Sequence, residues 1–387
     1  MYMKTILKQI LAVSVLSITT IPAIAQHYFS DAQKSEWLKK AQENTPELFY
    51  TTIKPEIQVD IVADKQSFQG YKAVNPRKAE GLYSESFKGK SGIVLDLGDH
   101  YTGYFTFRVE EFQSDSDAPI RLKFTFSEVP AELRIPFDPY KGTISRAWLQ
   151  DEVVTIEQLP ATIKIPRRLS CRYLQIDILG DSQYAQYRIS DMKFVAQTSA
   201  KGAPAALSTS DKLLQDIDKV SQKTLRECMQ TVFEDGPKRD HRLWIGDLYL
   251  QMLADNYTFQ NRALAKRCLY ILAGLCKDDG YLNHTIFETP VPHPQVVPIL
   301  LYEYALIYNA TLNDYLQETH DTQTALDLWP VAKRQIEKIP SLLDKDGLFD
   351  PEKANKQGLW QLVDWQESLD RQASEQGIYI FALEQTY

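Results

Sequence analysis

The hydrophobic period of the chain changes near residue 200, and this change restricts the fold more than any other feature. Before it, apolar and polar residues alternate in short segments interrupted by Gly, Asp, Ser and Pro, as in half-buried strands. After it, apolar residues recur every three or four positions, the period of an amphipathic helix. The segment at the boundary, "TSAKGAPAALSTSD" (198–211), consists mainly of small and polar residues, which is typical of a linker. We therefore predict a β domain followed by an all-helical domain.

The first part has no long helical pattern between its strands, which favours an antiparallel β-sandwich over residues 26–200. Its first segment, about 27–51, is predicted to be a helical or irregular lead-in. The predicted strands are 92–98, 103–112, 120–128, 151–159, 171–179 and 192–199. Residues 205–387 are predicted to form paired helices joined by turn-rich loops, as in a helical array or toroid. The predicted helices are 211–232, 240–260, 262–275, 294–310, 322–343 and 372–387.

The N-terminus has the order of a secretory signal peptide over residues 1–25. Lys4 and Lys8 precede an apolar run that starts at Ile10, and the small residues Ala23 and Ala25 follow it. This order predicts export, with a periplasmic or extracellular location. The apolar run is short and contains Ser and Thr, which argues against a membrane anchor, and we expect no membrane span.

Net charge and cysteine spacing argue against a nucleic-acid-binding protein and against a zinc site. The formal net charge of −8 argues against a nucleic-acid partner, which requires a basic surface. The four cysteines form neither a CxxC pair nor a zinc-ligand spacing, so we predict buried free thiols, no metal and no cofactor. Cys268 and Cys276 fall on one predicted helix, about 12 Å apart and too far for a disulfide. The oligomeric state stays open.

The segment "FEDGPKRDHRLWIGD" (233–247) gathers acids, bases and a tryptophan. Gly236, Pro237 and Gly246 interrupt regular structure inside it, so its charges do not have the spacing of a solvated helix face. One interpretation is a charged turn between two helices, in which Asp240 caps the second helix and the acids pair with arginines. The other interpretation is a ligand-binding site.

The segment resembles the "DCPQRDERLGWTGD" signature of the α-L-rhamnosidase glycoside hydrolases, which are six-hairpin glycosidases with an (α/α)6 barrel. The matching positions are Asp235, Pro237, Arg239, Asp240, Arg242, Leu243, Gly246 and Asp247. "LDLGDHYTGYFTFRV" (95–109) is similar to the β-sandwich segment of that family, and "LVDWQESLD" (362–370) to its later "GDW" segment. The resemblance implies an N-terminal antiparallel β-sandwich followed by an incomplete (α/α)6 toroid, with residues 205–387 as its first half.

The resemblance also implies a function. It indicates a secreted glycoside hydrolase that removes terminal α-L-rhamnosyl or similar residues from plant or bacterial glycans. The partner would be an oligosaccharide or glycoside substrate. The implied mechanism is inverting, in which one carboxylic acid protonates the leaving oxygen and a second carboxylate activates water. We expect the second carboxylate in a portion beyond Tyr387.

Several residues are predicted to bind the sugar. In the resemblance, acids accept hydrogen bonds from ring hydroxyls and an arginine donates them, while tryptophans offer surfaces on which a sugar ring stacks. The predicted substrate-binding residues are Asp235, Arg239, Trp244, Asp364 and Trp365.

The proton donor is open between three residues, because His241 stands where the family has its glutamate general acid. The sequence is also one residue shorter between Leu243 and Gly246. Asp247 or Asp240 can supply the proton if crowding with other acids raises its pKa, and Asp247 is preferred. His241 can act as an imidazolium acid, since its unperturbed pKa is about 6.5. In the third interpretation the protein binds sugar and cleaves slowly or not at all.

Two other function classes remain. A polysaccharide lyase can use a helical toroid, with Arg239 beside a uronate and His241 or Tyr249 as the base. A non-catalytic carbohydrate-binding protein is the other. His284 and His293 lie in loops predicted to face the same rim, without the spacing of a metal site.

Overall fold

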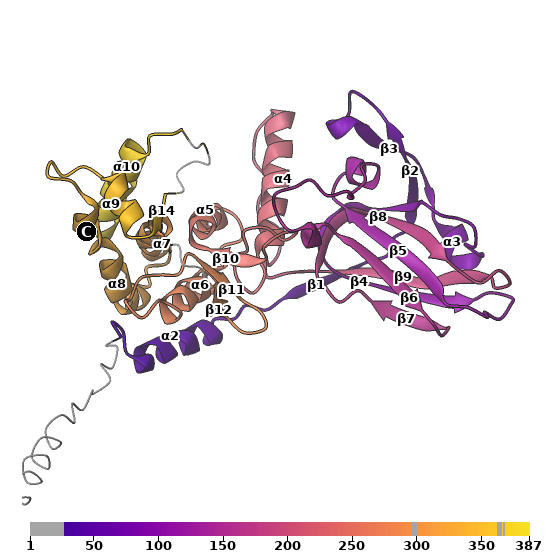
Figure 1. Ribbon diagram of the computed structural model, residues 1–387, viewed down its shortest axis with the longest axis horizontal. Coiled ribbons are helices and arrows are strands. Elements are labelled where there is room, and N and C mark those ends of the chain that lie inside the picture. The colour runs from indigo at the N-terminus through magenta and orange to yellow at the C-terminus, as the bar shows by residue number, and fades with distance from the viewer. Residues whose placement is uncertain (1–26, 296–299, 362–365, 367) are drawn as a thin grey trace, which may run out of the picture.

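A computed structural model of the chain describes residues 27–295, 300–361, 366 and 368–387. A β domain and a helical domain lie side by side, and the long helix α4 (Lys212–Cys228) stands at their boundary (Figure 1). The predicted order, with the β domain first and the helical domain second, is confirmed.

Every strand pairing in the β domain is antiparallel, as predicted. The main order is β1–β9–β4–β8–β5–β6, with β2 and β7 also paired to β4, and β3 to β2. The strands are β1 (Phe49–Ile53), β2 (Ile57–Ala63), β3 (Tyr71–Lys78), β4 (Ile93–Glu111), β5 (Ile120–Ser127), β6 (Asp151–Ile156), β7 (Ala161–Lys164), β8 (Leu169–Gly180) and β9 (Tyr187–Thr198). Short helices between them are η1 (Phe68–Gly70), α3 (Glu80–Ser84), η2 (Pro130–Leu133) and η3 (Arg146–Trp148).

The long strand β4 joins the two halves of the sheet. Its first residues pair with β2 and β8, and its last residues pair with β7 and β9. The predicted strands 92–98 and 103–112 are therefore one strand, with a register shift between Asp96 and Tyr101 in place of a turn. Gly98 lies inside this shift with φ 84°, a conformation that glycine adopts without a steric penalty.

Alternating positions of the central strands fill the core of the β domain. Phe105 and Phe107 of β4 point to the same face as Phe124 and Phe126 of β5, and all four are at most 1% exposed. The rings of Phe107 and Phe124 lie 4.5 Å apart between centroids. This period of two explains why the strand pattern was readable from the sequence.

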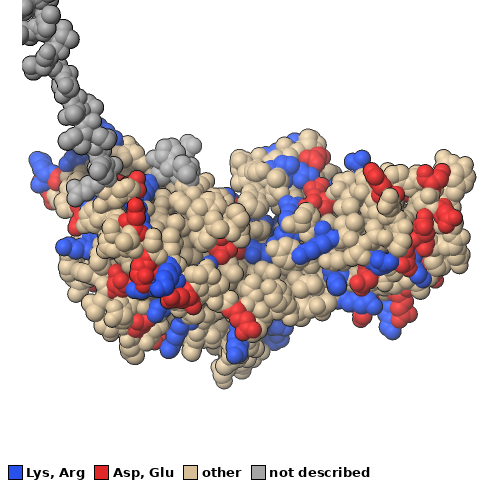
Figure 2. Space-filling model, turned by 90° about the horizontal axis from the view of Figure 1, so that it is seen from below, with Lys and Arg blue, Asp and Glu red and all other residues tan. Residues whose placement is uncertain are grey.

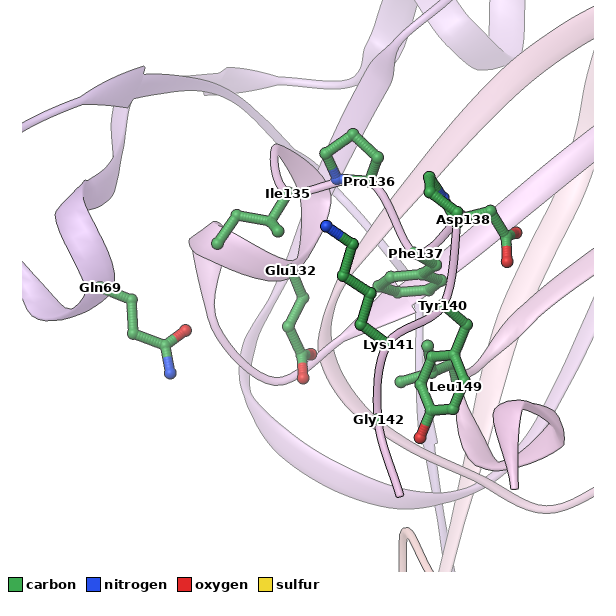
Figure 3. A pocket seen from close by; sticks show the side chains of 11 residues that line it. Gln69, Glu132, Ile135, Pro136, Phe137, Asp138, Tyr140, Lys141, Gly142 and Leu149 are labelled. Carbon is green, nitrogen blue, oxygen red and sulfur yellow. The ribbon is translucent and has the colours of Figure 1, made fainter. Parts of the chain in front are cut away.

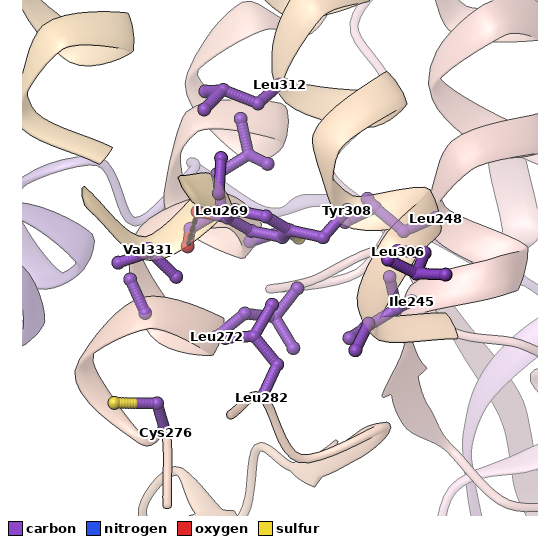
Figure 4. Packing of buried hydrophobic residues seen from close by; sticks show 14 of the residues in the cluster. Ile245, Leu248, Leu269, Leu272, Cys276, Leu282, Leu306, Tyr308, Leu312 and Val331 are labelled. Carbon is purple, nitrogen blue, oxygen red and sulfur yellow. Dashed lines mark hydrogen bonds between the residues drawn. The ribbon is translucent and has the colours of Figure 1, made fainter. Parts of the chain in front are cut away.

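The helical domain packs its helices around a second core. Its helices are α5 (Ile245–Asn256), α6 (Arg262–Gly274), α7 (Tyr302–Thr319), α8 (Thr322–Ile336), η4 (Ile339–Leu342), α9 (Pro351–Lys356) and α10 (Gln372–Thr386). Its short strands are β10 (Arg242–Trp244), β11 (Thr285–Phe287), β12 (His293–Pro294), β13 (Leu300–Leu301) and β14 (Leu359–Trp360). Figure 4 shows Leu248, Leu269, Leu306 and Val331 converging from α5, α6, α7 and α8. Among the described residues, no helix combines the length and apolarity that a bilayer crossing requires.

Two predicted helices begin later than the sequence pattern suggested. The helix expected from residue 240 starts at Ile245, because Asp240 and His241 have left-handed backbone (φ 68° and 52°) and residues 242–244 pair with β11 as a strand. The prediction that Asp240 caps this helix was therefore wrong, and Trp244 occupies the N-cap position. The helix expected over 294–310 is α7, which begins at Tyr302.

The N-terminal lead-in packs against the helical domain, although the predicted boundaries group it with the β-sandwich. Its helix α2 (Asp31–Glu43) runs along α6 (Figure 1) and buries Trp37 and Ala41. A Cβ at Gly274 would lie 2.6 Å from Leu38 Cγ, so this close approach requires glycine. The chain then crosses to the β domain through β1. The N-terminal segment thus links the two domains.

The four cysteines all lie in the described part of the chain, and each is a buried free thiol. Figure 2 shows Lys and Arg interspersed with Asp and Glu on the face seen from below, so that face carries no extended field of one sign. The buried free thiols agree with the sequence analysis.

Candidate active site

Residues 233–247, here called the site loop, connect α4 to α5 and close on themselves. The backbone N–H of Asp235 donates to the carbonyl oxygen of Arg242 at 3.0 Å, and the N–H of Arg242 donates to Oδ1 of Asp235 at 3.2 Å. The left-handed backbone of Asp240 and His241 turns the chain back toward Asp235. This closure brings Asp235 toward Asp247 in the first turn of α5.

Burial raises the pKa of three acids of the site loop, Glu234, Asp235 and Asp247. Glu234 is paired with Arg168, whereas Asp235 and Asp247 form no ion pair within the described part of the chain. Burial raises the pKa of Asp235 to about 7, and the charges of Asp240 and Asp247 add to this shift. Burial also raises the pKa of Asp247, with a further contribution from Asp240, while the charge of Arg239 opposes it. A carboxyl group with a pKa near neutrality is suited to general acid catalysis. The sequence analysis expected crowding with other acids to raise these pKa values; burial is the larger cause, and the neighbouring acids add to it.

Asp240 has a different environment from these two acids. Its Oδ1 lies 3.3 Å from Nη1 of Arg239 and 3.9 Å from Nη2 of Arg242. The guanidinium of Arg242 lies over the ring of Phe287, 4.1 Å from its centroid, and donates to Gln295 at 2.9 Å. Asp240 is thus held as one member of an ion-pair cluster, and Arg239 remains half-exposed beside it.

Trp244, His284 and Tyr304 form an aromatic wall beside Asp235 and Asp247. The ring of Trp244 lies 5.4 Å from His284 and 6.2 Å from Tyr304, the latter at an interplanar angle of 87°. A Cβ at Gly246 would lie 2.6 Å from the ring of Tyr304, so the first turn of α5 contacts this tyrosine directly. Burial raises the pKa of Tyr304 to about 12, and the charge of Asp247 is the next cause. Tyr304 gave no signal in the sequence, because only the folding of α7 onto α5 brings it here.

Two nitrogens of this wall lack partners within the described part of the chain. They are Nε1 of Trp244 and Nδ1 of His284, and both are buried. Burial also lowers the pKa of His284 to about 4, so its imidazole is neutral at neutral pH. Buried polar atoms usually have hydrogen-bond partners, so each of these nitrogens keeps unused hydrogen-bonding capacity next to the acids.

His241 points toward the β domain. Its ring meets Trp148 edge to face at 5.6 Å, and Arg168, which pairs with Glu234, lies close enough to affect its charge. Burial, followed by the charge of Arg168, lowers the pKa of His241 to about 4. The imidazole is therefore neutral at neutral pH, which does not favour its use as an imidazolium acid.

The site loop is also tied to the β domain by an interdomain ion network, formed by His100, Glu128, Glu132, Glu227 and Lys238. Nζ of Lys238 lies 2.9 Å from Glu128 and 2.6 Å from Glu132. His100 bonds to Glu128 at 3.1 Å and to Glu227 of α4. Burial alone would lower the pKa of His100, but its bonds to the two glutamates raise it to about 9. Sequence reasoning missed this network, because its two halves, residues 100–132 and 227–238, are more than 90 residues apart in the chain.

Four other residues from the sequence analysis remain to be placed. Asp364 and Trp365 lie outside the described residues. Tyr249, the alternative base of a lyase, packs edge to face on Phe381 of α10 at 6.3 Å. His293 stacks on Phe287 at 5.1 Å, behind Arg242. Among the described residues, no group of His, Cys, Asp and Glu side chains has the arrangement of a metal site.

Two family models match the chain. The model of the glycosyl hydrolase family 78 alpha-rhamnosidase N-terminal domain matches residues 55–196. The model of the bacterial alpha-L-rhamnosidase 6 hairpin glycosidase domain matches residues 203–381. No curated protein sequence matches the chain.

Solved structures share the fold. A rhamnosidase from Klebsiella oxytoca with rhamnose bound is 36% identical, with a TM-score of 0.84 over 91% of this chain and 67% of that chain. A GH78 family rhamnosidase of Bacillus sp. GL1 is 21% identical, with a TM-score of 0.59 over 76% of this chain and 28% of that one. The native α-L-rhamnosidase from Aspergillus terreus is 13% identical, with a TM-score of 0.58 over 89% and 36%. The last two similarities show the fold alone.

Proposed function

The chain belongs to the family 78 α-L-rhamnosidase glycoside hydrolases, and from this premise we propose that it hydrolyses terminal α-L-rhamnosyl or similar residues of an oligosaccharide or glycoside. The observation that carries the proposal is the pair of acids with raised pKa, Asp235 and Asp247, beside an aromatic wall. The Klebsiella relative, solved with rhamnose bound, supports the choice of sugar.

Asp247 is the proposed proton donor. Glycoside cleavage requires a protonated carboxyl at the leaving oxygen, and burial favours the protonated form of Asp247. Its charge affects Tyr304, which places the carboxyl beside the aromatic wall where a sugar ring would stack. Asp240, held by arginines, is suited to stabilise positive charge on the ring carbon.

Asp235, Arg239 and Trp244 are the proposed sugar-binding residues. With a pKa of about 7, Asp235 can donate as well as accept a hydrogen bond near neutral pH. The half-exposed guanidinium of Arg239 can donate to ring hydroxyls. Trp244 offers an indole face and an Nε1–H that has no partner among the described residues.

The test compares three asparagine variants on substrates with different leaving groups. We expect Asp247→Asn to lower kcat/KM by about 10²-fold or more when a sugar is the leaving group. The loss should be much smaller with a dinitrophenyl leaving group, because this group departs without a proton. Asp235→Asn and Asp240→Asn should lose activity on both substrates alike, since they act on the sugar common to both.

Asp255→Asn is the matched control. Asp255 lies on the same helix as Asp247, and burial raises its pKa to about 6, but it accepts a hydrogen bond from the Asn261 backbone at the other end of α5. An equal loss on both substrates for Asp247→Asn would remove it from proton transfer. Binding without release of sugar would indicate a non-catalytic protein, and an unsaturated, ultraviolet-absorbing product would indicate a lyase.

The inverting mechanism and export are further parts of this proposal. Inversion predicts that the first sugar released has the anomeric configuration opposite to that of the substrate, which proton NMR detects during the reaction. Export predicts a mature protein that begins at Gln26, which N-terminal sequencing of extracellular or periplasmic material would identify.

A further inference from the structure

The β domain has a pocket next to the site loop, here called the β-domain pocket. Its volume is about 550 Å³, which lies within the range of small-molecule sites. Residues 135–142 form one wall, and Gln69 of η1 faces them from another segment (Figure 3). Glu132 of η2 and Leu149 also line the pocket.

The lining combines aromatic rings with hydrogen-bonding groups of both charges. Phe137 and Tyr140 supply the rings, and Ile135, which is 51% exposed, adds apolar surface. The charged lining residues are Glu132, Asp138 and Lys141. Glu132 is paired with Lys238 and Asp138 with Arg146, so the pocket does not select a strongly charged ligand. Rings that contact C–H faces, together with donors and acceptors for hydroxyls, fit a neutral sugar.

Interactions within the β domain hold this wall in place. Arg146 bonds to Asp138 at 3.1 and 2.9 Å and to Asp151 of β6 at 2.8 and 2.9 Å. Its guanidinium also lies 5.4 Å from the ring centroid of Phe137. Such bidentate pairs fix orientation as well as position, so the wall is formed without a ligand.

Two contacts connect the β-domain pocket to the site loop. Glu132, which lines the pocket, also binds Lys238 of the site loop at 2.6 Å. Leu149 lines the pocket as well, and its chain neighbour Trp148 contacts His241 of the site loop at 5.6 Å. The pocket wall is therefore attached to the loop that carries Asp235 and Asp247.

We propose that the β-domain pocket is a leaving-group subsite that holds a neutral sugar unit of the substrate beyond the scissile bond. The inference rests on the proposed glycosidase function and adds to it a preference for extended glycosides. The two contacts place the pocket beside the site loop, and the lining supplies the chemistry that recognises a sugar.

The experiment measures sugar release from two substrates with the full chain. The short substrate is nitrophenyl α-L-rhamnoside, and the extended one carries a glucose unit between rhamnose and the nitrophenyl group. Phe137→Ala and Tyr140→Ala should lower the ratio of kcat/KM for the extended over the short substrate by about tenfold. Lys141→Ala, at an exposed position outside the core, should lower the ratio in the same direction by a smaller factor.

Tyr184→Ala is the control, because Tyr184 is a 73% exposed tyrosine of the β domain that does not line this pocket. It should keep the wild-type ratio. A wild-type ratio in all three pocket variants would overturn the inference. An equal loss on both substrates would also overturn it, because the pocket would then act only by supporting the site loop.

Direct binding separates this inference from the proposed function. If the chain cleaves neither substrate, the proposed function fails. Saturation-transfer NMR with methyl β-glucoside then tests whether the β-domain pocket binds a neutral sugar. A signal with the wild type that Phe137→Ala abolishes supports the subsite. No signal at millimolar glucoside, or a signal that all pocket variants retain, overturns it.

Discussion

Two acid-rich clusters meet in the site loop, where Asp235 of one lies three residues before Lys238 of the other, and they have opposite electrostatics. In the interdomain ion network, His100 and Lys238 outweigh the effect of burial and lower the pKa of Glu128 to about 2. In the site loop, Asp235 is buried near other acids, and its pKa rises to about 7. The difference is a directly bonded cation. Glu128, which has such partners, stabilises the domain arrangement, whereas Asp235, which has none among the described residues, remains able to exchange a proton. A bonded cation does not always suffice, because the more deeply buried Glu234 keeps a raised pKa beside Arg168.

The largest effect is expected for Asp235→Asn. The variant should lose about 10²-fold or more in kcat/KM, because the carboxyl is proposed to hold the sugar. Its stability at pH 8 should rise, because the change removes a carboxylate that burial and neighbouring acids destabilise. Steady-state kinetics and urea unfolding measure the two effects. A parallel loss of activity and stability would place Asp235 with the structural acids.

Glu128→Gln tests the other cluster. It leaves His100 and Lys238 short of a carboxylate, and we expect a loss of about 1–2 kcal/mol in unfolding free energy. Glu85→Gln, which changes an exposed acid near Lys90, is the control and should have little effect. Urea unfolding checks both variants. A stability equal to that of wild type would show that the network does not contribute to holding the domains together.

The stabilising contribution of the interdomain ion network should depend on pH through His100. His100 has a pKa of about 9 in the folded protein against an ordinary value near 6.5. Its stabilising contribution is therefore complete below pH 6.5 and is lost as the pH rises through about 9. The difference in unfolding free energy between wild type and His100→Gln, about 1 kcal/mol at pH 6, should shrink by pH 9.5. A difference that is constant over this range would contradict the assignment.

Asp235 should lower stability in the same direction, but over a more acidic range of pH than His100. Because its folded pKa is raised, stability falls as the pH rises from about 4 to about 7, and Asp235→Asn should flatten this part of the profile. Unfolding curves measured at half-unit steps of pH test the change. The slope of the wild type persisting in the variant would indicate that another group titrates there.

The smallest effect is expected for Trp148→Ala. Removing this ring exposes His241 to water, so the pKa of His241 should rise from about 4 toward its ordinary value, as NMR titration would show. Activity on the short substrate should change by less than about threefold, since the imidazole is not proposed to donate a proton. A large loss of activity with a normal fold would return His241 to the list of possible acids.

Local patterns in the sequence predicted much of the fold. The period of two in β4 and β5, and the helical period after residue 211, reflect which side chains face each core, and the structure confirms both domains. The pattern failed at Asp240 and His241, where left-handed backbone delays α5. It also could not assign α2 to a domain, because a short amphipathic helix does not specify which surface it covers.

The sequence by itself determined the order of the two domains, the family and the identity of the acids in the site loop, because these depend on residue type and spacing. Only the tertiary structure decided which acids are paired and which are not. It placed Tyr304 and His284 beside Trp244, turned His241 toward Trp148, and joined Glu132 to the site loop. The physical reason is that a pKa depends on burial and on charges a few ångströms away, and these are supplied by segments distant in the chain.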